Sequence, residues 1–155
     1  MELILWRHAE AADTTPDLAR ELTHKGRRQA RDMAAWLTGQ LSAYPAGAVR
    51  VIASPAVRTR QTAEALGLPV EIVTHIDPDA TADDLLAASG WPDSHNVVIL
   101  VGHNPAISAL AARLAGAGGA SVSLGRACAW WYASGADGAL VLKTAMTPAL
   151  LHRAT

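Results

Sequence analysis

The stretch LILWRH at residues 3–8 places an arginine and a histidine directly after four apolar residues. Two further apolar runs end in a similar way: VRVIA at 49–53 precedes Ser54-Pro55, and VVILV at 97–101 precedes Gly102-His103. In an open parallel sheet, ligands bind just beyond the carboxyl ends of the strands. We therefore expect the three strand ends to meet in one crevice, where histidine and arginine side chains face a small anion.

The remaining sequence shows strand and helix signals in alternation, which predicts an α/β fold: a three-layer α/β/α sandwich with a mostly parallel central sheet. At 155 residues the chain fits a single domain, residues 1–155. Residues 9–22 show no periodicity. We expect strands at 3–6, 49–53, 70–73 and 97–101, and a hairpin of two further strands at 127–133 and 139–144 with its turn at 135–138. Helices are expected at 23–41 and 81–89, from Ser54-Pro55 to Gly67, and from Asn104-Pro105 to Leu114. A glycine-rich loop follows the last of these helices at 116–119.

Composition narrows the classes of function. Thirteen basic and fourteen acidic residues give a formal charge of -1, so the basic surface of a nucleic-acid or membrane binder is not expected. Cys128 is the single cysteine, which excludes an internal disulfide and a cysteine zinc site. No apolar run is long enough for a secretory signal or a membrane span. We expect a cytoplasmic protein, monomeric by default, with neither nucleic-acid nor membrane partners.

The residues at the strand ends suit phosphate chemistry. A neutral imidazole such as that of His8 can attack phosphorus, and neighbouring arginines such as Arg7 oppose its protonation and bind phosphate oxygens. Arg58 and His103 lie close to helix starts, where backbone N–H groups and the helix dipole favour an anion. Taken singly, each has an ordinary alternative: a hydrogen-bonded structural histidine, a solvated arginine or an exposed loop histidine.

Four motifs in this order resemble the histidine phosphatase superfamily, the phosphoglycerate-mutase-like enzymes, and specifically its small SixA-like branch of phosphohistidine phosphatases. They are LWRHAEA at 5–11, Leu22-Thr23 with Gly26, SPAVRTRQTA at 54–63 and VGHNP at 101–105. The resemblance implies a phosphoglycerate mutase-like fold and a catalytic role for four residues. His8 is then the transiently phosphorylated nucleophile, Arg7 and Arg58 clamp the phosphoryl group, and His103 donates a hydrogen bond to it.

Two roles stay open. Ser54 is a candidate N-cap, with a phosphate contact as its second reading. Larger members of the family carry an acid after the second helix that protonates the leaving alkoxide. Asp77 or Asp79 is the candidate here, against the alternative that both residues form a turn beside Pro78.

The leaving group favours phosphohistidine as substrate. An imidazole has a pKa of about 6.5 and leaves phosphorus with little assistance, whereas an alkoxide needs a proton from a well-placed acid. A weak or absent acid therefore favours phosphohistidine over a phosphate ester. We expect a hydrolase that needs neither metal nor cofactor and that dephosphorylates phosphohistidine on a partner protein. The alternatives are a phosphatase for a small phosphomonoester, such as a sugar or nucleotide phosphate, and a catalytically idle phosphate-binding module.

Other features have plainer interpretations. His24, His75, His95 and His152 are too scattered for a zinc site, and Gly102-His103-Asn104 lacks the lysine and spacing of a nucleotide P-loop. Trp130 and Trp131 fall on opposite faces of a strand, one in the core and one near an exposed edge. The basic group Arg27, Arg28 and Arg31 is expected to be a solvated helix face, with an acidic partner as the alternative.

Overall fold

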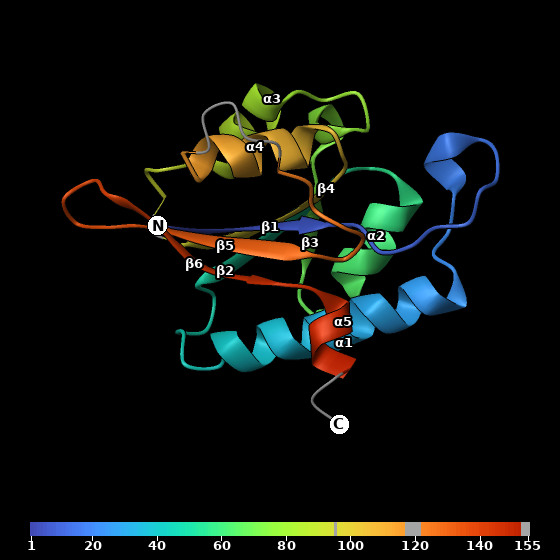
Figure 1. The fold of residues 1–155 in the computed structure, drawn as a ribbon, viewed down its shortest axis with the longest axis horizontal. Helices are drawn as coiled ribbons and strands as arrows, with labels where there is room; N and C mark the ends of the chain where they lie inside the picture. Colours follow the sequence, from blue (N-terminus) through green and yellow to red (C-terminus); the bar gives the residue numbers. More distant parts are fainter. Residues whose placement is uncertain (95, 117–121, 153–155) are drawn as a thin grey trace.

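A six-stranded sheet forms the centre of the computed structural model, which describes residues 1–94, 96–116 and 122–152. The strands are β1 (Glu2–Arg7), β2 (Val49–Ala53), β3 (Val70–Ile72), β4 (Val97–Gly102), β5 (Ala129–Ser134) and β6 (Leu140–Met146). They lie in the order β3-β2-β4-β1-β5-β6 with helices on both faces (Figure 1). The predicted three-layer α/β/α sandwich is therefore confirmed.

Strand β1 lies inside the sheet, between one parallel and one antiparallel neighbour. It pairs in parallel with β4, so that Arg7 lies opposite Gly102, and antiparallel with β5. Because β2 and β3 also run parallel to β4, the sheet is mostly parallel, as predicted. The carboxyl ends of β1, β2 and β4 thus lie along one edge of the sheet.

The last two strands form the predicted hairpin, each starting one or two residues later than expected. Gly138 has a φ of +79°, which a glycine adopts without strain, and the N–H of Gly135 donates to the carbonyl of Ala139 at 2.7 Å to close the turn. Trp131 is buried in the core on one face of the sheet, and Trp130 packs half-buried against the other face. The predicted opposite faces and the core position of one tryptophan are confirmed, but Trp130 does not lie at an exposed edge, because β6 pairs with β5 on its outer side.

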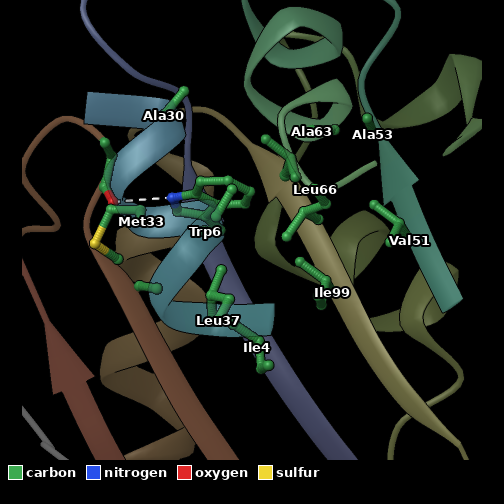
Figure 2. Packing of buried hydrophobic residues seen from close by; sticks show 14 of the residues in the cluster. Ile4, Trp6, Ala30, Met33, Leu37, Val51, Ala53, Ala63, Leu66 and Ile99 are labelled. Carbon is green, nitrogen blue, oxygen red and sulfur yellow. Dashed lines mark hydrogen bonds between the residues drawn. The ribbon is translucent and has the colours of Figure 1, made fainter. Parts of the chain in front are cut away.

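One face of the sheet is covered by α1 (His24–Leu41), α2 (Val57–Glu64) and α5 (Pro148–His152). Figure 2 shows Met33 and Leu37 of α1 packed near Ile4 and Trp6 of β1, all four fully buried. Burial of each such side chain contributes about 1.5–3 kcal/mol. As predicted, Thr23 caps α1: its hydroxyl oxygen accepts a hydrogen bond from the N–H of Gly26 at 3.0 Å.

The other face is covered by α3 (Ala82–Ser89) and α4 (Ala106–Leu114). Leu3 and Leu5, which alternate with Ile4 and Trp6 along β1, belong to this second core together with Leu110 of α4. Alternate residues of β1 therefore pack into the two cores on opposite faces of the sheet, which is why residues 3–6 are all apolar.

Two predicted helix starts are wrong by one or two residues. The N-cap of α2 is Ala56, so Ser54 does not cap this helix and Pro55 is not its first residue. The N-cap of α4 is Pro105 instead of Asn104. The Ser54 hydroxyl instead accepts from the N–H of Ala56 at 3.2 Å and bonds to a histidine ring, so a tertiary contact prevailed over the local capping signal.

Short elements complete the fold. Two 3₁₀ turns, η1 (Asp17–Ala19) and η2 (Thr74–Ile76), and the five-residue α5 were not predicted, because so few residues show no helical period. Of the expected glycine-rich loop at 116–119, residues 117–119 lie outside the described residues. No helix in the described part of the chain is long and apolar enough to cross a bilayer.

Candidate active site

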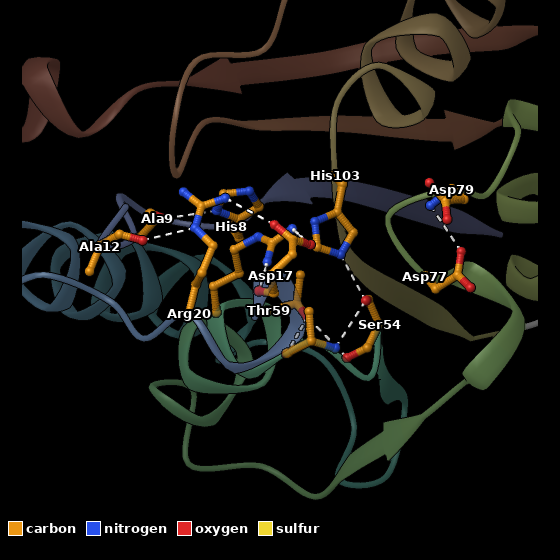
Figure 3. A network of polar contacts seen from close by, with 12 residues as sticks. His8, Ala9, Ala12, Asp17, Arg20, Ser54, Thr59, Asp77, Asp79 and His103 are labelled. Carbon is orange, nitrogen blue, oxygen red and sulfur yellow. Dashed lines mark hydrogen bonds and ion pairs between the residues drawn. The ribbon is translucent and has the colours of Figure 1, made fainter. Parts of the chain in front are cut away.

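The expected convergence of strand ends occurs. Arg7 is the last residue of β1 and His8 follows it, Ser54 follows β2, and His103 follows β4. Figure 3 shows His8, His103 and Ser54 gathered at this edge of the sheet. The rings of His8 and His103 lie with their centroids 5.3 Å apart, at an angle of 57°.

His8 is held at both its backbone and its ring. Its backbone N–H donates to the carbonyl of Gly102 at 3.1 Å, and ring atom Nδ1 lies 2.7 Å from the carbonyl oxygen of Ala9. Since that carbonyl can only accept, Nδ1 carries the hydrogen and Nε2 keeps its lone pair. Burial, reinforced by the charges of Arg58 and Arg7 and opposed by the Ala9 contact, lowers the pKa of His8 to about 4. The ring is therefore neutral at pH 7.

His103 has one engaged and one free ring nitrogen. Its Nε2 lies 2.7 Å from the hydroxyl oxygen of Ser54, whereas its buried Nδ1 has no hydrogen-bond partner among the described residues. Burial is the main cause that lowers the pKa of His103 to about 3, with the positive charge of Arg58 acting in the same direction. This ring, too, is neutral at pH 7.

Two arginines, whose charges act on both histidines, have unpaired donors. Arg7 donates from Nη1 to the carbonyl of Leu124 at 2.9 Å, and Arg58, which is 4% exposed, donates from Nη1 and Nη2 to Asp17. The Nε atoms of both arginines have no partner. Together with Nδ1 of His103, they are the buried side-chain atoms that lack a hydrogen bond in the described part of the chain. Each buried unpaired polar atom costs about 1–3 kcal/mol. The arrangement therefore suits an anion that accepts from the two Nε–H groups and, in the tautomer with its hydrogen on Nδ1, from His103.

Two residues at the site were missed by the sequence analysis. Asp17, in η1, accepts from Arg58 at 3.1 Å and from Arg20 at 3.2 Å, and Arg20 also donates from Nε to the carbonyl of Ala12 at 2.8 Å. Burial raises the pKa of Asp17, but the hydrogen bonds from both arginines outweigh this and lower it. Both residues lie in the stretch 9–22, whose pattern gives no signal, and Arg58 is distant from them in sequence.

The two candidate acids lie away from this cluster. Figure 3 shows Asp77 and Asp79 on the far side of His103 from His8. The Oδ1 atom of Asp77 accepts from the backbone N–H of Asp79 at 2.9 Å, and the carbonyl of Asp77 accepts from Ala80 at 3.0 Å. These contacts match the turn-forming alternative.

Metal ligands do not cluster in the described residues: no group of three or more histidine, cysteine, aspartate or glutamate side chains lies where it could hold an ion. Of the four scattered histidines, His24 and His75 are exposed, and His95 lies outside the described residues. The positive charge at the site comes from arginine side chains.

Comparison with known proteins gives consistent similarities. The model of the histidine phosphatase superfamily (branch 1) matches residues 3–81. The chain is 32% identical over 123 residues to the phosphohistidine phosphatase SixA of Escherichia coli (strain K12), covering 74% of each protein. It superposes on the structure of a protein histidine phosphatase SixA complexed with tungstate with a TM-score of 0.75 and 27% identity, covering 97% of this chain and 99% of that one. A SixA structure from Nakamurella multipartitia gives a TM-score of 0.73 and 29% identity, with 95% of both chains covered.

Proposed function

The chain belongs to the histidine phosphatase superfamily, and on that premise we propose that it hydrolyses phosphorylated substrates through a covalent phosphohistidine on His8. The observation that carries the proposal is the set of three unpaired donors, on Arg7, Arg58 and His103, around a neutral histidine. A tetrahedral phosphoryl group presents oxygens to all three donors at once. The tungstate complex of the SixA relative supports an oxyanion site in this fold.

In the first step, Nε2 of His8 attacks phosphorus with its lone pair. The bond between phosphorus and the leaving atom breaks, and the leaving group takes up a proton from bulk water. Arg7 and Arg58 hold the oxygens, and Nδ1–H of His103 donates to them as negative charge accumulates. Water then attacks the phosphorus of the phosphorylated His8, which releases phosphate and restores the imidazole. These groups supply the charge stabilisation, and we infer that no metal is required.

The leaving group indicates the substrate. Asp77 is held within its own turn, and Asp17 is kept ionised by two arginines, so neither is placed or protonated as a strong general acid. An imidazole leaves with little assistance, whereas an alkoxide does not. We therefore place phosphohistidine on a partner protein ahead of a small phosphomonoester. The similarity to phosphohistidine phosphatases supports the same order.

The test is direct labelling of the enzyme. Rapid mixing with ³²P-phosphoramidate and alkaline quenching should leave an acid-labile label on the parent protein, and none on His8→Asn, which keeps a polar side chain of similar size. Circular dichroism checks that the variant is folded. A labelled His8→Asn, or equal turnover by both proteins, overturns the role of His8.

A second assay tests which class of substrate the enzyme prefers. Turnover of a phosphohistidine peptide is measured beside a panel of sugar and nucleotide monophosphates, with and without EDTA. We expect higher kcat/KM on the peptide and no effect of EDTA. A preference for a monophosphate would favour the phosphomonoester alternative, and a loss of activity in EDTA would contradict metal independence.

A further inference from the structure

A cleft that is separate from the candidate active site lies between the start of α1 and the start of α5. Its volume is about 310 Å³, and it is lined by Lys25, Arg28 and Gln29 of α1, by Arg126 before β5, and by residues 147–149. In Figure 1, α1 begins at the end of the sheet toward which β1 points. The cleft is therefore on the same side of the molecule as His8.

The cleft carries an excess of positive charge. Lys25, Arg28 and Arg126 are all exposed, and neither Lys25 nor Arg28 forms an ion pair among the described residues. Arg126 pairs with Glu10 at 3.4 Å, a long contact with more than half of the arginine side chain exposed. Such a surface pair contributes less than about 1 kcal/mol, so Arg126 can exchange it for another carboxylate.

The basic residues of α1 lie where a helix disfavours positive charge. The first turn of α1 contains no acidic residue, although the start of a helix favours negative groups and disfavours cations. Lys25 and Arg28 therefore add positive potential where the helix dipole is already positive. The chain as a whole has a formal charge of -1, so this is a local concentration of positive charge and not a general property of the surface.

Glu10 connects the cleft to the active-site loop. It is two residues from His8, its carboxylate contacts both Arg126 and the capping residue Thr23, and its backbone N–H donates to Gln29 at 3.0 Å. A polypeptide that presents a phosphorylated side chain to His8 can thus lay neighbouring residues along Arg126 and the start of α1.

We propose that this basic cleft docks an acidic stretch of the phosphorylated partner protein, with carboxylates adjacent to the phosphohistidine pairing with Lys25, Arg28 and Arg126. The proposal rests on the proposed function and adds the chemistry of the partner to it. Charge complementarity acts on encounter and binding, so the cleft affects KM and leaves the chemical step unchanged.

The experiment uses two phosphohistidine peptides that are identical except that the aspartates and glutamates of one are replaced by asparagine and glutamine in the other. The double variant Lys25→Glu/Arg28→Glu is compared with the parent and with Arg113→Glu. This control reverses an exposed charge on α4, on the opposite face of the sheet, where Arg113 pairs with Asp83. Phosphoramidate serves as the substrate without a peptide.

We expect the double variant to lose about tenfold in kcat/KM on the acidic peptide at low salt, through a higher KM, since charge reversal at a docking site mainly slows encounter. Turnover of the neutral peptide and of phosphoramidate should stay within about twofold of the parent by the same reasoning. The control variant should resemble the parent on all three substrates. Equal losses on the acidic and neutral peptides, or no loss on either, overturn the proposal.

A binding measurement separates this proposal from the phosphatase assignment. Fluorescence anisotropy with the unphosphorylated acidic peptide, labelled with fluorescein, reports docking even if the parent hydrolyses no phosphohistidine. Binding by the parent that is lost in the double variant supports the cleft. Absence of binding, or tighter binding of a single-stranded RNA of equal charge, contradicts it.

Discussion

The hydroxyl oxygen of Ser54 lies 2.7 Å from Nε2 of His103, and both groups are buried at the carboxyl ends of neighbouring strands. The same oxygen already accepts from the N–H of Ala56, so the serine hydrogen is available for the ring. If it is donated to Nε2, His103 must carry its own hydrogen on the unpaired Nδ1. Ser54 then sets the tautomer that the proposed role of His103 requires, with the hydrogen on Nδ1.

The first prediction concerns this contact. Ser54→Ala should lower kcat/KM for phosphoramidate about tenfold, the effect of one lost hydrogen bond to a group that acts in the transition state. The ¹⁵N shifts of His103 should change from a single tautomer to a mixture, which a purely structural role for Ser54 would not produce. Unchanged shifts together with a lower unfolding midpoint would assign the serine to stability alone.

A second prediction concerns Asp17, whose carboxylate forms an ion pair with the guanidinium of Arg58. Asp17→Asn should strengthen inhibition by inorganic phosphate about fivefold, because one unit of negative charge beside the anion is worth about 1 kcal/mol. Arg58 keeps its bond to the backbone carbonyl of residue 17 in the variant. Weaker inhibition would instead mean that the carboxylate mainly orients Arg58.

A third prediction compares two glycines of α1. A Cβ on Gly26 would lie 1.9 Å from the carbonyl oxygen of Glu10, whereas a Cβ on Gly39 would meet no atom within 4 Å. Gly26→Ala should cost about 1–3 kcal/mol of unfolding free energy, because backbone must shift. Gly39→Ala should gain about 0.5–1 kcal/mol from the better helix former. Urea unfolding checks both, and a neutral Gly26→Ala would contradict the close approach of α1 to the active-site loop.

A fourth prediction follows from the lowered pKa values of His8, about 4, and His103, about 3. The unfolded chain takes up protons at these side chains near pH 6.5, whereas the folded protein does not, so stability falls as the pH drops from about 6.5 toward 4. Each histidine contributes a slope of up to about 1.4 kcal/mol per pH unit within that window. Urea unfolding between pH 7 and 4.5 in a phosphate-free buffer should show this slope, and His103→Asn should reduce it. A slope unaffected by the variant would assign the acid sensitivity to other groups.

The sequence was sufficient to predict those parts of the fold and the site that depend on local residue patterns and on where the strands end. The apolar run at residues 3–6 predicts β1, and the rule that parallel strands end at one edge brings Arg7, His8 and His103 together before any contact is known. The same reasoning predicts the two helical layers, because residues with helical spacing alternate with buried strands.

Local residue patterns did not predict the positions of side chains whose partners are distant in the sequence. Asp17 and Arg20 acquire their place from Arg58, far along the chain, and nothing in residues 9–22 encodes that pairing. Ser54 precedes a proline and has the sequence of an N-cap, yet its hydroxyl bonds to His103, which a neighbouring strand supplies. A capping signal contributes about 1 kcal/mol, so a buried hydrogen bond to a ring nitrogen can override it.

The backbone of His8 is fixed from two directions: its N–H donates to Gly102 in β4, and its carbonyl accepts from Ala127, just before β5. Both partners are translated long after the N-terminal motif. A nascent chain that has emerged only as far as α2 therefore contains His8 without either of the backbone partners that fix its position. The geometry around this histidine depends on a frame that is completed only when the segment around residue 127 has been made.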